Sequence, residues 1–157
     1  MRYDRAIFAG SFDPFHNGHL SVAMEAARIF KTVVVKVMNN PAKQHRFDIG
    51  QRFAMVKAAV EGNDCGIIAE IDAYGTLAAC AKYGDAAIVR GIRNGKDIEP
   101  ELELNSITRL YYPDVLTVLI PCEPEYAYLS STIVRGLWDA SLDVTPVAPW
   151  LVGVIGQ

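Results

Sequence analysis

The chain has 157 residues, a length that predicts one domain over residues 1–157 with a single buried core. Its 51% apolar and 21% charged residues exclude disordered and fibrous classes. A formal net charge of -3 argues against a protein that binds nucleic acid mainly through its charge, so we expect no nucleic-acid partner. Any anion that the protein binds should therefore meet a local site.

The cysteines and the apolar runs indicate the cellular compartment of the protein. Cys65, Cys80 and Cys122 are odd in number and lack CxxC spacing, which favours neither a disulfide framework nor a zinc site. No apolar run approaches the ~18 residues of a membrane span. We therefore expect a cytoplasmic protein with no membrane partner.

Strands and helices alternate in the first half of the chain. Residues 6–9 form a short apolar run that predicts a buried strand, and a Gly/Pro/Asn-rich loop follows over residues 10–18. Apolar residues at helical spacing then continue to Phe30. The β-branched run at 33–38 predicts a second strand, and Asp48 with Gln51 forms a capping box that opens a helix to about Val60.

The second half repeats this alternation. The expected elements are a strand at 66–71, a helix at 76–82, a strand at 86–89, a helix ending before Pro113 and a strand at 115–120. After them we expect a further helix to about Ala140, capped within residues 130–132, and a short packing helix within 146–157. Strands that alternate with helices imply a parallel sheet with helices on both faces. We predict an α/β fold, a single doubly wound, Rossmann-like domain with a five-stranded parallel sheet. Ligands bind such sheets outside the carboxyl ends of the strands, so the loops after strands one, two and four are the expected site.

The loop after the first strand carries the strongest chemical pattern. It runs from Gly10 through Ser11, Phe12 and His16 to His19, and it contains two of the three histidines. We expect Asn17 to be the N-cap of the following helix, which places His19 in its first turn, where unpaired N–H groups favour an anion. We also expect Gly10 to allow close backbone approach and Gly18 to leave room for a ligand. Neither GxGxxG nor GxxxxGK[ST] occurs in the loop, which excludes a dinucleotide fingerprint and a Walker P-loop.

The loop by itself also fits a plainer interpretation. Two histidines at HxxH spacing occur on the surface of many tight strand–helix turns that bind nothing. A zinc site through His16 and His19 is the less favoured alternative, because no third ligand is evident nearby and His45 lies in a separate loop.

Four loops in chain order carry a resemblance to a known family. His16-Asn17-Gly18-His19 resembles the HxGH signature of the small nucleotidyltransferase superfamily. The further matching segments are Asn40-Pro41-Ala42-Lys43, Arg90-Gly91-Ile92-Arg93 and the run from Leu129 to Arg135. Together the four segments are similar to those of the phosphopantetheine adenylyltransferases, and they extend across nearly the whole chain.

The resemblance implies an activity and its partners. The family transfers AMP from ATP to 4'-phosphopantetheine with the help of Mg²⁺, giving dephospho-coenzyme A and pyrophosphate in coenzyme A biosynthesis. Similar enzymes form hexamers, so a homo-oligomer is expected. The alternatives are a nicotinamide or nicotinate mononucleotide adenylyltransferase, a cytidylyltransferase, or a catalytically silent nucleotide-binding module. Because the phosphate nucleophile is already an anion, alignment and charge neutralisation matter more than a strong base.

The matched positions imply roles for individual residues. The catalytic residues would be His19, Lys43 and Arg90. The ATP site would comprise Ser11, Phe12, His16, His19, Gly91, Arg93, Glu101, Tyr126, Ser130, Ser131 and Thr132. The acceptor would contact Ser11, Lys43, Thr76 and Arg90. No residue is expected to be a permanent metal ligand.

Each of these loops also has an ordinary interpretation. Lys43 could be a solvated lysine, and Arg90 with Arg93 could bridge surface carboxylates. Ser130 to Thr132 could be a helix cap alone. Three positions depart from the family pattern: His16 stands where Thr is common, Gly75 where Leu is usual and Pro100 where an aromatic residue is frequent.

Overall fold

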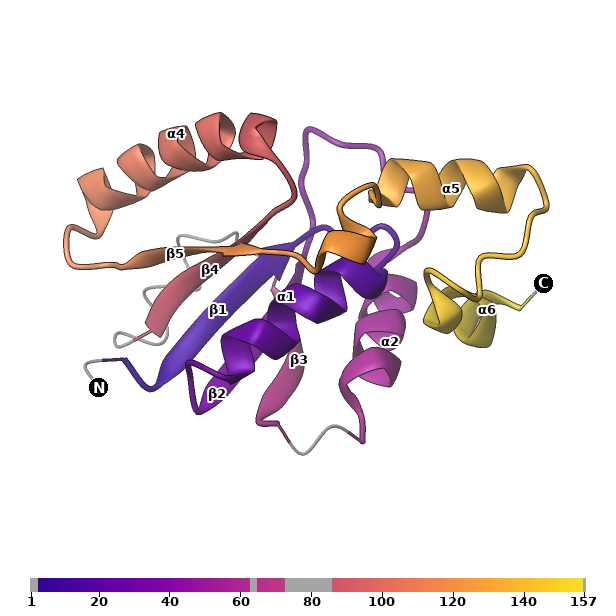
Figure 1. The fold of residues 1–157 in the computed structure, drawn as a ribbon, viewed down its shortest axis with the longest axis horizontal. Helices are drawn as coiled ribbons and strands as arrows, with labels where there is room; N and C mark the ends of the chain where they lie inside the picture. The colour runs from indigo at the N-terminus through magenta and orange to yellow at the C-terminus, as the bar shows by residue number, and fades with distance from the viewer. Residues whose placement is uncertain (1–2, 63–64, 73–85, 157) are drawn as a thin grey trace.

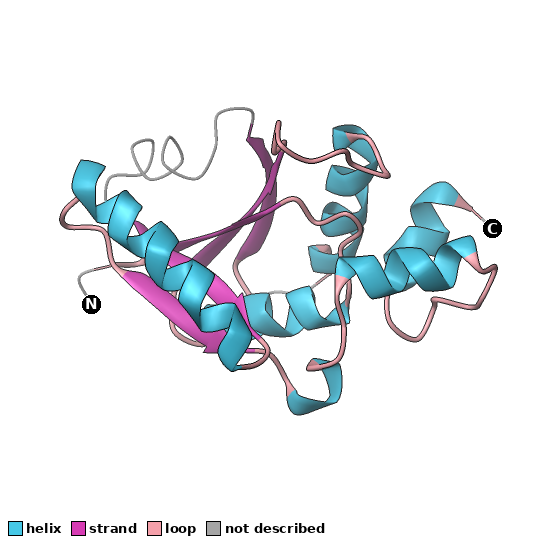
Figure 2. Cartoon of the chain, turned by 90° about the horizontal axis from the view of Figure 1, so that it is seen from above, coloured by secondary structure: helices cyan, strands magenta, loops and turns pink. Residues whose placement is uncertain are grey.

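The fold is a parallel sheet with helices on both faces, as Figures 1 and 2 show. The computed structural model describes residues 3–62, 65–72 and 86–156. Its five strands lie in the order β3-β2-β1-β4-β5, and every adjacent pair is parallel. This confirms the predicted α/β, Rossmann-like class.

The strand order puts β1 at the centre of the sheet. The strands are β1 (Arg5–Gly10), β2 (Thr32–Met38), β3 (Ile67–Asp72), β4 (Ala86–Ile92) and β5 (Thr117–Pro121). From β1 the chain moves outward through β2 to β3 and then returns to place β4 on the other side of β1. The loops after β1 and β4 therefore meet at the point where the strand order reverses, which is where open α/β sheets bind ligands.

The helices of the described residues begin at capped positions or prolines. They are α1 (Asn17–Ala27), α2 (Ile49–Val60), α4 (Gly95–Tyr111), α5 (Ser131–Asp139) and α6 (Pro149–Ile155), with a 3₁₀ turn, η1 (Pro124–Tyr126), before α5. Asp48 accepts a hydrogen bond from the Gln51 N–H at 2.8 Å, which confirms the predicted capping box. None of the described helices is both long and apolar enough to cross a membrane.

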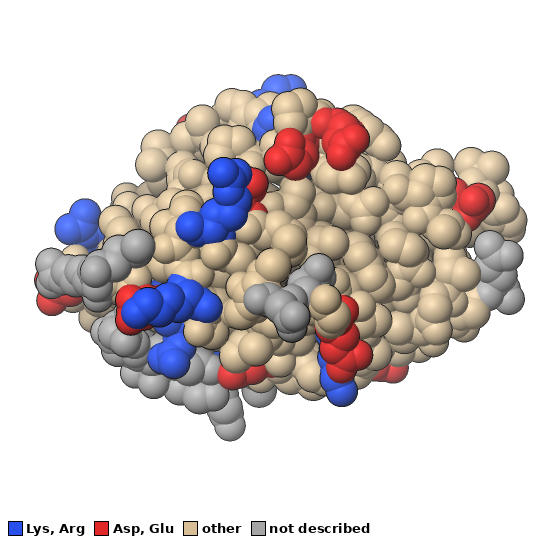
Figure 3. All heavy atoms as spheres, turned by 60° about the horizontal axis from the view of Figure 1, so that its bottom comes forward, with Lys and Arg blue, Asp and Glu red and all other residues tan. Residues whose placement is uncertain are grey.

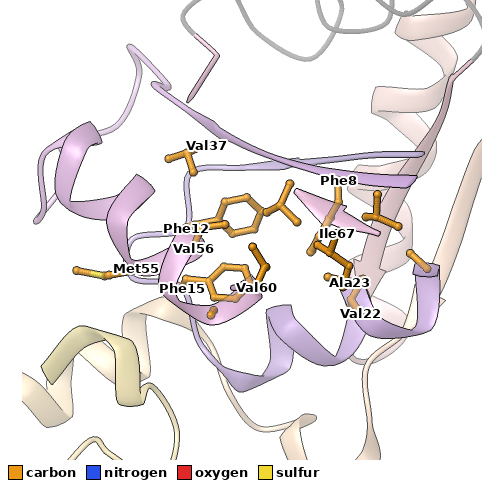
Figure 4. Packing of buried hydrophobic residues seen from close by; sticks show 14 of the residues in the cluster. Phe8, Phe12, Phe15, Val22, Ala23, Val37, Met55, Val56, Val60 and Ile67 are labelled. Atoms are coloured by element: carbon orange, nitrogen blue, oxygen red, sulfur yellow. The ribbon is translucent and has the colours of Figure 1, made fainter. Parts of the chain in front are cut away.

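The main core lies between the sheet and helices α1, α2 and α6. Figure 4 shows part of this packing, with the rings of Phe12 and Phe15 near Val56 and Val60 of α2, and Val22 and Ala23 of α1 nearer to Ile67. On the opposite face α4 packs against β4 and β5 through side chains that include Thr108. Gly91 fits its place because a Cβ there would lie 2.9 Å from a methyl group of Val22. Helix α1 can thus approach β4 closely only where the strand has no side chain.

Some predicted boundaries are off by one to three residues, the largest difference being the fourth strand, which continues to Ile92 and not to 89. The third strand begins at Ile67 and not at 66, and the fifth covers Thr117–Pro121 and not 115–120, so the turn after the preceding helix is longer than expected. Helix α5, predicted to run to about Ala140, ends at Asp139. The helix expected at 76–82 lies outside the described residues.

Candidate functional site

Four loops at the carboxyl edge of the sheet enclose a cavity of about 700 Å³. The loops follow β1, β2, β4 and β5, which the strand order brings together around the central strand. The cavity is lined by Ser11, Phe12, His16, His19, Lys43, Arg90, Gly91, Arg93, Glu101, Tyr126, Ser130, Ser131 and Thr132, among others. Every predicted site residue that lies within the described part of the chain therefore faces one cavity. The remaining one, Thr76, lies outside the described residues, as does Gly75.

Helix α1 begins one residue earlier than predicted. His16 is the N-cap, and Asn17, predicted to cap the helix, is its first residue. The Asn17 side chain instead donates to the Pro146 carbonyl at 3.0 Å, so it ties the helix start to the C-terminal segment. The space predicted above Gly18 for a ligand is partly filled, because a Cβ there would lie 3.1 Å from the His16 ring.

The two histidines form a stacked pair at this helix start. Their ring centroids are 3.7 Å apart, and the His19 ring also contacts Phe12 and Phe15 at 5.0 and 5.4 Å. The backbone N–H of His16 donates to Nδ1 of the His19 ring at 3.3 Å. An Nδ1 that accepts must be unprotonated, so neutral His19 carries its hydrogen on Nε2. That N–H is the one His19 can offer to a ligand.

Burial keeps both rings neutral near pH 7. Desolvation lowers the pKa of His16 to about 4, and the positive charge of Arg93 adds to the shift. The pKa of His19 also lies well below its ordinary value, first through burial and then through the neighbouring His16 and Arg93. Nδ1 of His16 is buried without a hydrogen-bond partner among the described residues. The pair therefore acts as neutral donors and acceptors.

Arg90 is held by a partner that was predicted to belong to the same site. Its Nε and Nη2 donate to the two carboxylate oxygens of Glu101 at 2.6 and 2.9 Å, and Nη1 donates to the Ala9 carbonyl at 2.9 Å. A guanidinium has five N–H groups, so one on each terminal nitrogen remains after these three bonds. Arg90 is oriented by α4 and still has donors to offer.

Arg93 joins the β4 loop to the β5 loop. It pairs with Asp97 through Nε and Nη2 at 3.0 and 2.9 Å, and Nη1 donates to the Leu129 carbonyl at 3.0 Å. Donating these hydrogen bonds to Asp97 raises the pKa of Arg93, and accepting them lowers the pKa of Asp97. The ordinary interpretation, in which Arg90 and Arg93 bridge carboxylates, is correct as far as it goes, yet both side chains line the cavity.

Lys43 differs from the two arginines in having an unengaged head group. Its backbone N–H donates to the Asn40 carbonyl at 3.0 Å, which closes a turn after β2. No described residue forms an ion pair or hydrogen bond with its ammonium, and the residue is exposed at the cavity. Lys43 is therefore a mobile point charge at the cavity rim.

The start of α5 presents three hydroxyl groups. Ser130 is the N-cap and accepts from the Ile133 N–H at 3.1 Å, which confirms the predicted cap. Ser131 donates to the Pro14 carbonyl at 3.0 Å, and Thr132 accepts from Arg135 at 3.1 Å. The Ser131 bond, together with the one that Arg135 donates to the Asp13 carbonyl, fixes α5 to the β1 loop. The helix start that results points unpaired N–H groups and a positive dipole end toward an anion.

Further charged residues complete the cavity, and sequence reasoning did not assign them. Lys96 lies in the first turn of α4, and Arg135 lies on α5. Asp13 accepts from the Arg46 and Phe47 N–H groups at 2.9 and 3.0 Å. Lys96 could have been predicted from the sequence, because it is a cation in the first turn of the helix that follows β4. Nothing in the sequence signalled the contact between Asp13 and the loop after β2.

The cavity is positive although the chain is not. Five Lys and Arg side chains line it against three carboxylates: Lys43, Arg90, Arg93, Lys96 and Arg135 against Asp13, Asp97 and Glu101. On the face drawn in Figure 3, charged residues of both signs lie in small separate groups. A net charge of -3 with a local excess of cations matches the prediction of a local anion site. Within the described residues no group of His, Cys, Asp and Glu could hold a metal ion, so the zinc alternative finds no support there.

Comparison with known proteins relates the chain to one family over nearly its whole length. Residues 7–137 match the family model described as cytidylyltransferase-like. A phosphopantetheine adenylyltransferase of Micrococcus luteus is 38% identical over 146 residues, which cover 92% of each chain. Those of Kocuria rhizophila and Haemophilus ducreyi are 39% and 35% identical, covering 92% and 93% of this chain and 92% and 90% of their own lengths. The relatives and this chain thus correspond over nearly their whole lengths, and the four cavity loops all fall within the matched region. The chain belongs to the phosphopantetheine adenylyltransferases of the cytidylyltransferase-like family.

Proposed function

We propose that the protein transfers the adenylyl group of ATP to 4'-phosphopantetheine, giving dephospho-coenzyme A and pyrophosphate. The observation that carries the proposal is the near full-length match to relatives of that name, combined with one positive cavity that collects the four matching loops. The acceptor phosphate attacks the α-phosphorus and the bond to pyrophosphate breaks. No proton needs to be removed from the nucleophile.

The nucleotide would bind on the side of the cavity formed by α1 and α5. Helix N-termini favour anions, and the starts of these two helices meet at the cavity through His16 and Ser130. The Nε2–H of neutral His19 would donate to an oxygen of the α-phosphate. That oxygen gains negative charge in the transition state, so the bond strengthens as the reaction proceeds.

The acceptor phosphate would bind between Lys43 and Arg90. Arg90 is held against Glu101 and keeps two N–H groups for the ligand. Lys43 adds a charge that can follow the phosphate as it moves toward the α-phosphorus. Together they would hold an anionic nucleophile next to an anionic substrate, which is the principal electrostatic obstacle in this reaction.

We infer that Mg²⁺ enters with the nucleotide. The three cavity carboxylates are already engaged, Glu101 with Arg90, Asp97 with Arg93, and Asp13 with backbone N–H groups. Mg²⁺ commonly binds through substrate phosphates and water with few protein ligands, and this donor set fits that mode. When bound, the ion supplies neutralisation of polyphosphate charge. The chain's own cations and N–H groups then orient the reacting phosphates.

The decisive experiment is a substrate panel read by pyrophosphate release. ATP and CTP are each combined with 4'-phosphopantetheine, nicotinamide mononucleotide, nicotinate mononucleotide and glycerol 3-phosphate, with Mg²⁺ present throughout. We expect release with ATP and 4'-phosphopantetheine above every other pair. Preference for a different pair would replace the acceptor assignment, and release from no pair would indicate a silent nucleotide-binding module.

We also infer a homo-oligomer, the hexamer being the form expected from the family. Helix α4 has one fully buried residue, Thr108, among its 17 residues. It exposes the large apolar side chains of Leu102, Ile107, Leu110 and Tyr111. Large exposed apolar patches mark interaction surfaces. Sedimentation velocity of the purified protein measures the assembly, and a monomer at micromolar concentration would contradict this inference.

A further inference from the structure

Arg52 is a buried cation near the start of α2, away from the cavity lining. It heads the fully buried side chains of the described residues by volume, with only 1% of its surface exposed. Arginine is rarely buried this deeply unless its charge or its donors have fixed partners. The sequence alone suggested an ordinary amphipathic helix start at this position.

The guanidinium of Arg52 joins three separate segments of the site edge. Nη1 donates to the Ser11 carbonyl at 2.6 Å and to the Met38 carbonyl at 2.9 Å. Nη2 donates to the Asn39 side-chain oxygen at 2.5 Å, and Nε donates to the Phe47 carbonyl at 3.0 Å. One side chain thus connects the loop after β1, the end of β2 and the residue before the α2 cap.

These contacts hold the loop that carries Lys43 at both of its ends. Arg52 bonds to Asn39 at the start of the loop and to Phe47 at its end, and Asp13 binds the Arg46 and Phe47 N–H groups. The Lys43 ammonium has no partner among the described residues, so the ends of the loop determine where it lies. A change at Arg52 should therefore move Lys43 without touching it.

The charge of Arg52 is not neutralised by a close carboxylate. Its four hydrogen-bond acceptors are neutral oxygens, and no described carboxylate lies within ion-pair distance of it. Burial lowers the pKa of Arg52, while the more distant Asp13 and Asp48 oppose that shift. An arginine remains protonated at neutral pH, so a full positive charge stands behind the loops on the acceptor side.

We propose that Arg52 is a positioning residue for the acceptor phosphate, acting by fixing the Ser11 and Lys43 loops relative to each other. This rests on the proposed function, which assigns Lys43 to that phosphate. A purely structural arginine would affect both substrates equally when lost. A positioning residue on this side of the cavity should affect the acceptor far more than ATP.

The first test is Arg52→Lys, which keeps the charge but cannot reproduce the planar set of donors. KM for each substrate, kcat and the thermal unfolding midpoint are measured beside the wild type. We expect KM for 4'-phosphopantetheine to rise about tenfold while KM for ATP changes less than about twofold, since small misplacements of positioning groups have large kinetic effects. The matched control is Arg28→Lys, because Arg28 pairs with Glu25 on the surface with 76% of its side chain exposed. Equal changes in both KM values, or none, in the folded variant would overturn the proposal.

The second test needs no substrate. Hydrogen–deuterium exchange of the amides of residues 39–47 is compared in the wild type, Arg52→Lys and Asn39→Ala. Asn39→Ala removes one acceptor of the Arg52 guanidinium by changing an exposed side chain. This second variant keeps the proposal testable if Arg52→Lys fails to fold. Faster exchange in this loop with unchanged exchange in α5 supports the proposal. Wild-type exchange in both variants would refute it. An inactive wild type would instead contradict the proposed function, and the exchange rates would still decide whether Arg52 fixes the loop.

Discussion

The two sides of the cavity are built in different ways. The side proposed for the nucleotide consists of helix starts and buried rings, where the stacked His16 and His19 and the capping Ser130 have fixed positions. The acceptor side depends on long side chains, and of these Arg90 is held by Glu101 while Lys43 is unengaged. In the proposed reaction the reacting phosphorus would therefore meet preorganised groups, whereas the nucleophile would meet a flexible side chain that adapts to it.

The largest expected effect tests the preorganised side. His19→Ala removes a donor aimed at charge that develops in the transition state, so we expect kcat to fall by roughly 10²–10³ with a smaller change in KM for ATP. Steady-state pyrophosphate release measures both constants. A variant that retains near wild-type kcat would show that this helix start binds ATP without assisting the chemistry.

Burial of the same ring pair predicts a pH dependence of stability. His16 has a pKa of about 4 in the folded chain against 6.5 unfolded, so below pH 6.5 the unfolded chain takes up more protons. The free energy of unfolding should fall by up to about 3 kcal/mol between pH 6.5 and 4 through this group and then level off. Urea unfolding across this range measures it. His16→Asn, which keeps a good N-cap, should flatten the slope, and an unchanged slope would refute the assignment.

A change on the proposed acceptor side should alter the affinity for 4'-phosphopantetheine. Lys43→Ala removes one charge-assisted contact to the acceptor phosphate, so we expect KM for 4'-phosphopantetheine to rise about 10- to 100-fold, with little change in KM for ATP. The control is Lys31→Ala, an exposed lysine that pairs with Asp4 before β1. If calorimetry gave the same acceptor affinity for Lys43→Ala and the wild type, Lys43 would be an ordinary solvated residue.

The smallest expected effect concerns the cap of α5. Ser130→Ala removes the bond to the Ile133 N–H and should lower the free energy of unfolding by about 1 kcal/mol. Ser130→Asp, which restores a capping oxygen but adds a negative charge at the nucleotide side, should recover stability and weaken ATP binding. Recovery of both would mean that the hydroxyl caps the helix and does not face the polyphosphate.

Local patterns in the sequence predicted the fold and the edge of the sheet where the cavity lies, whereas the individual lining residues were predicted from the resemblance to the family. Alternating strands and helices determine a parallel sheet, and the loops that follow its strands must meet at one edge. Contacts distant in sequence could not be predicted in the same way. Arg90 and Glu101 were assigned to the site separately, yet their mutual bidentate pairing depends on how α4 packs against β4.

The start of α1 shows a second limit of sequence patterns. Asn17 has the stronger capping propensity, but its side chain finds a partner in the C-terminal segment and leaves the cap to His16. Such a competition between local and distant partners is invisible in a single sequence. The same holds for Arg52, whose four bonds reach residues on three segments.

The close approach of α1 to β4 at Gly91 joins the packing of the core to the geometry of the reaction. A Cβ at this position would lie 2.9 Å from a Val22 methyl group, so a substitution with alanine requires Val22 or the helix that carries it to shift. An alanine that shifts the helix would lengthen the gap between His19 and Arg93 while leaving both residues intact. The protein could then remain folded and bind its ligands while losing rate, which makes this glycine a spacer that sets the working distance of the enzyme.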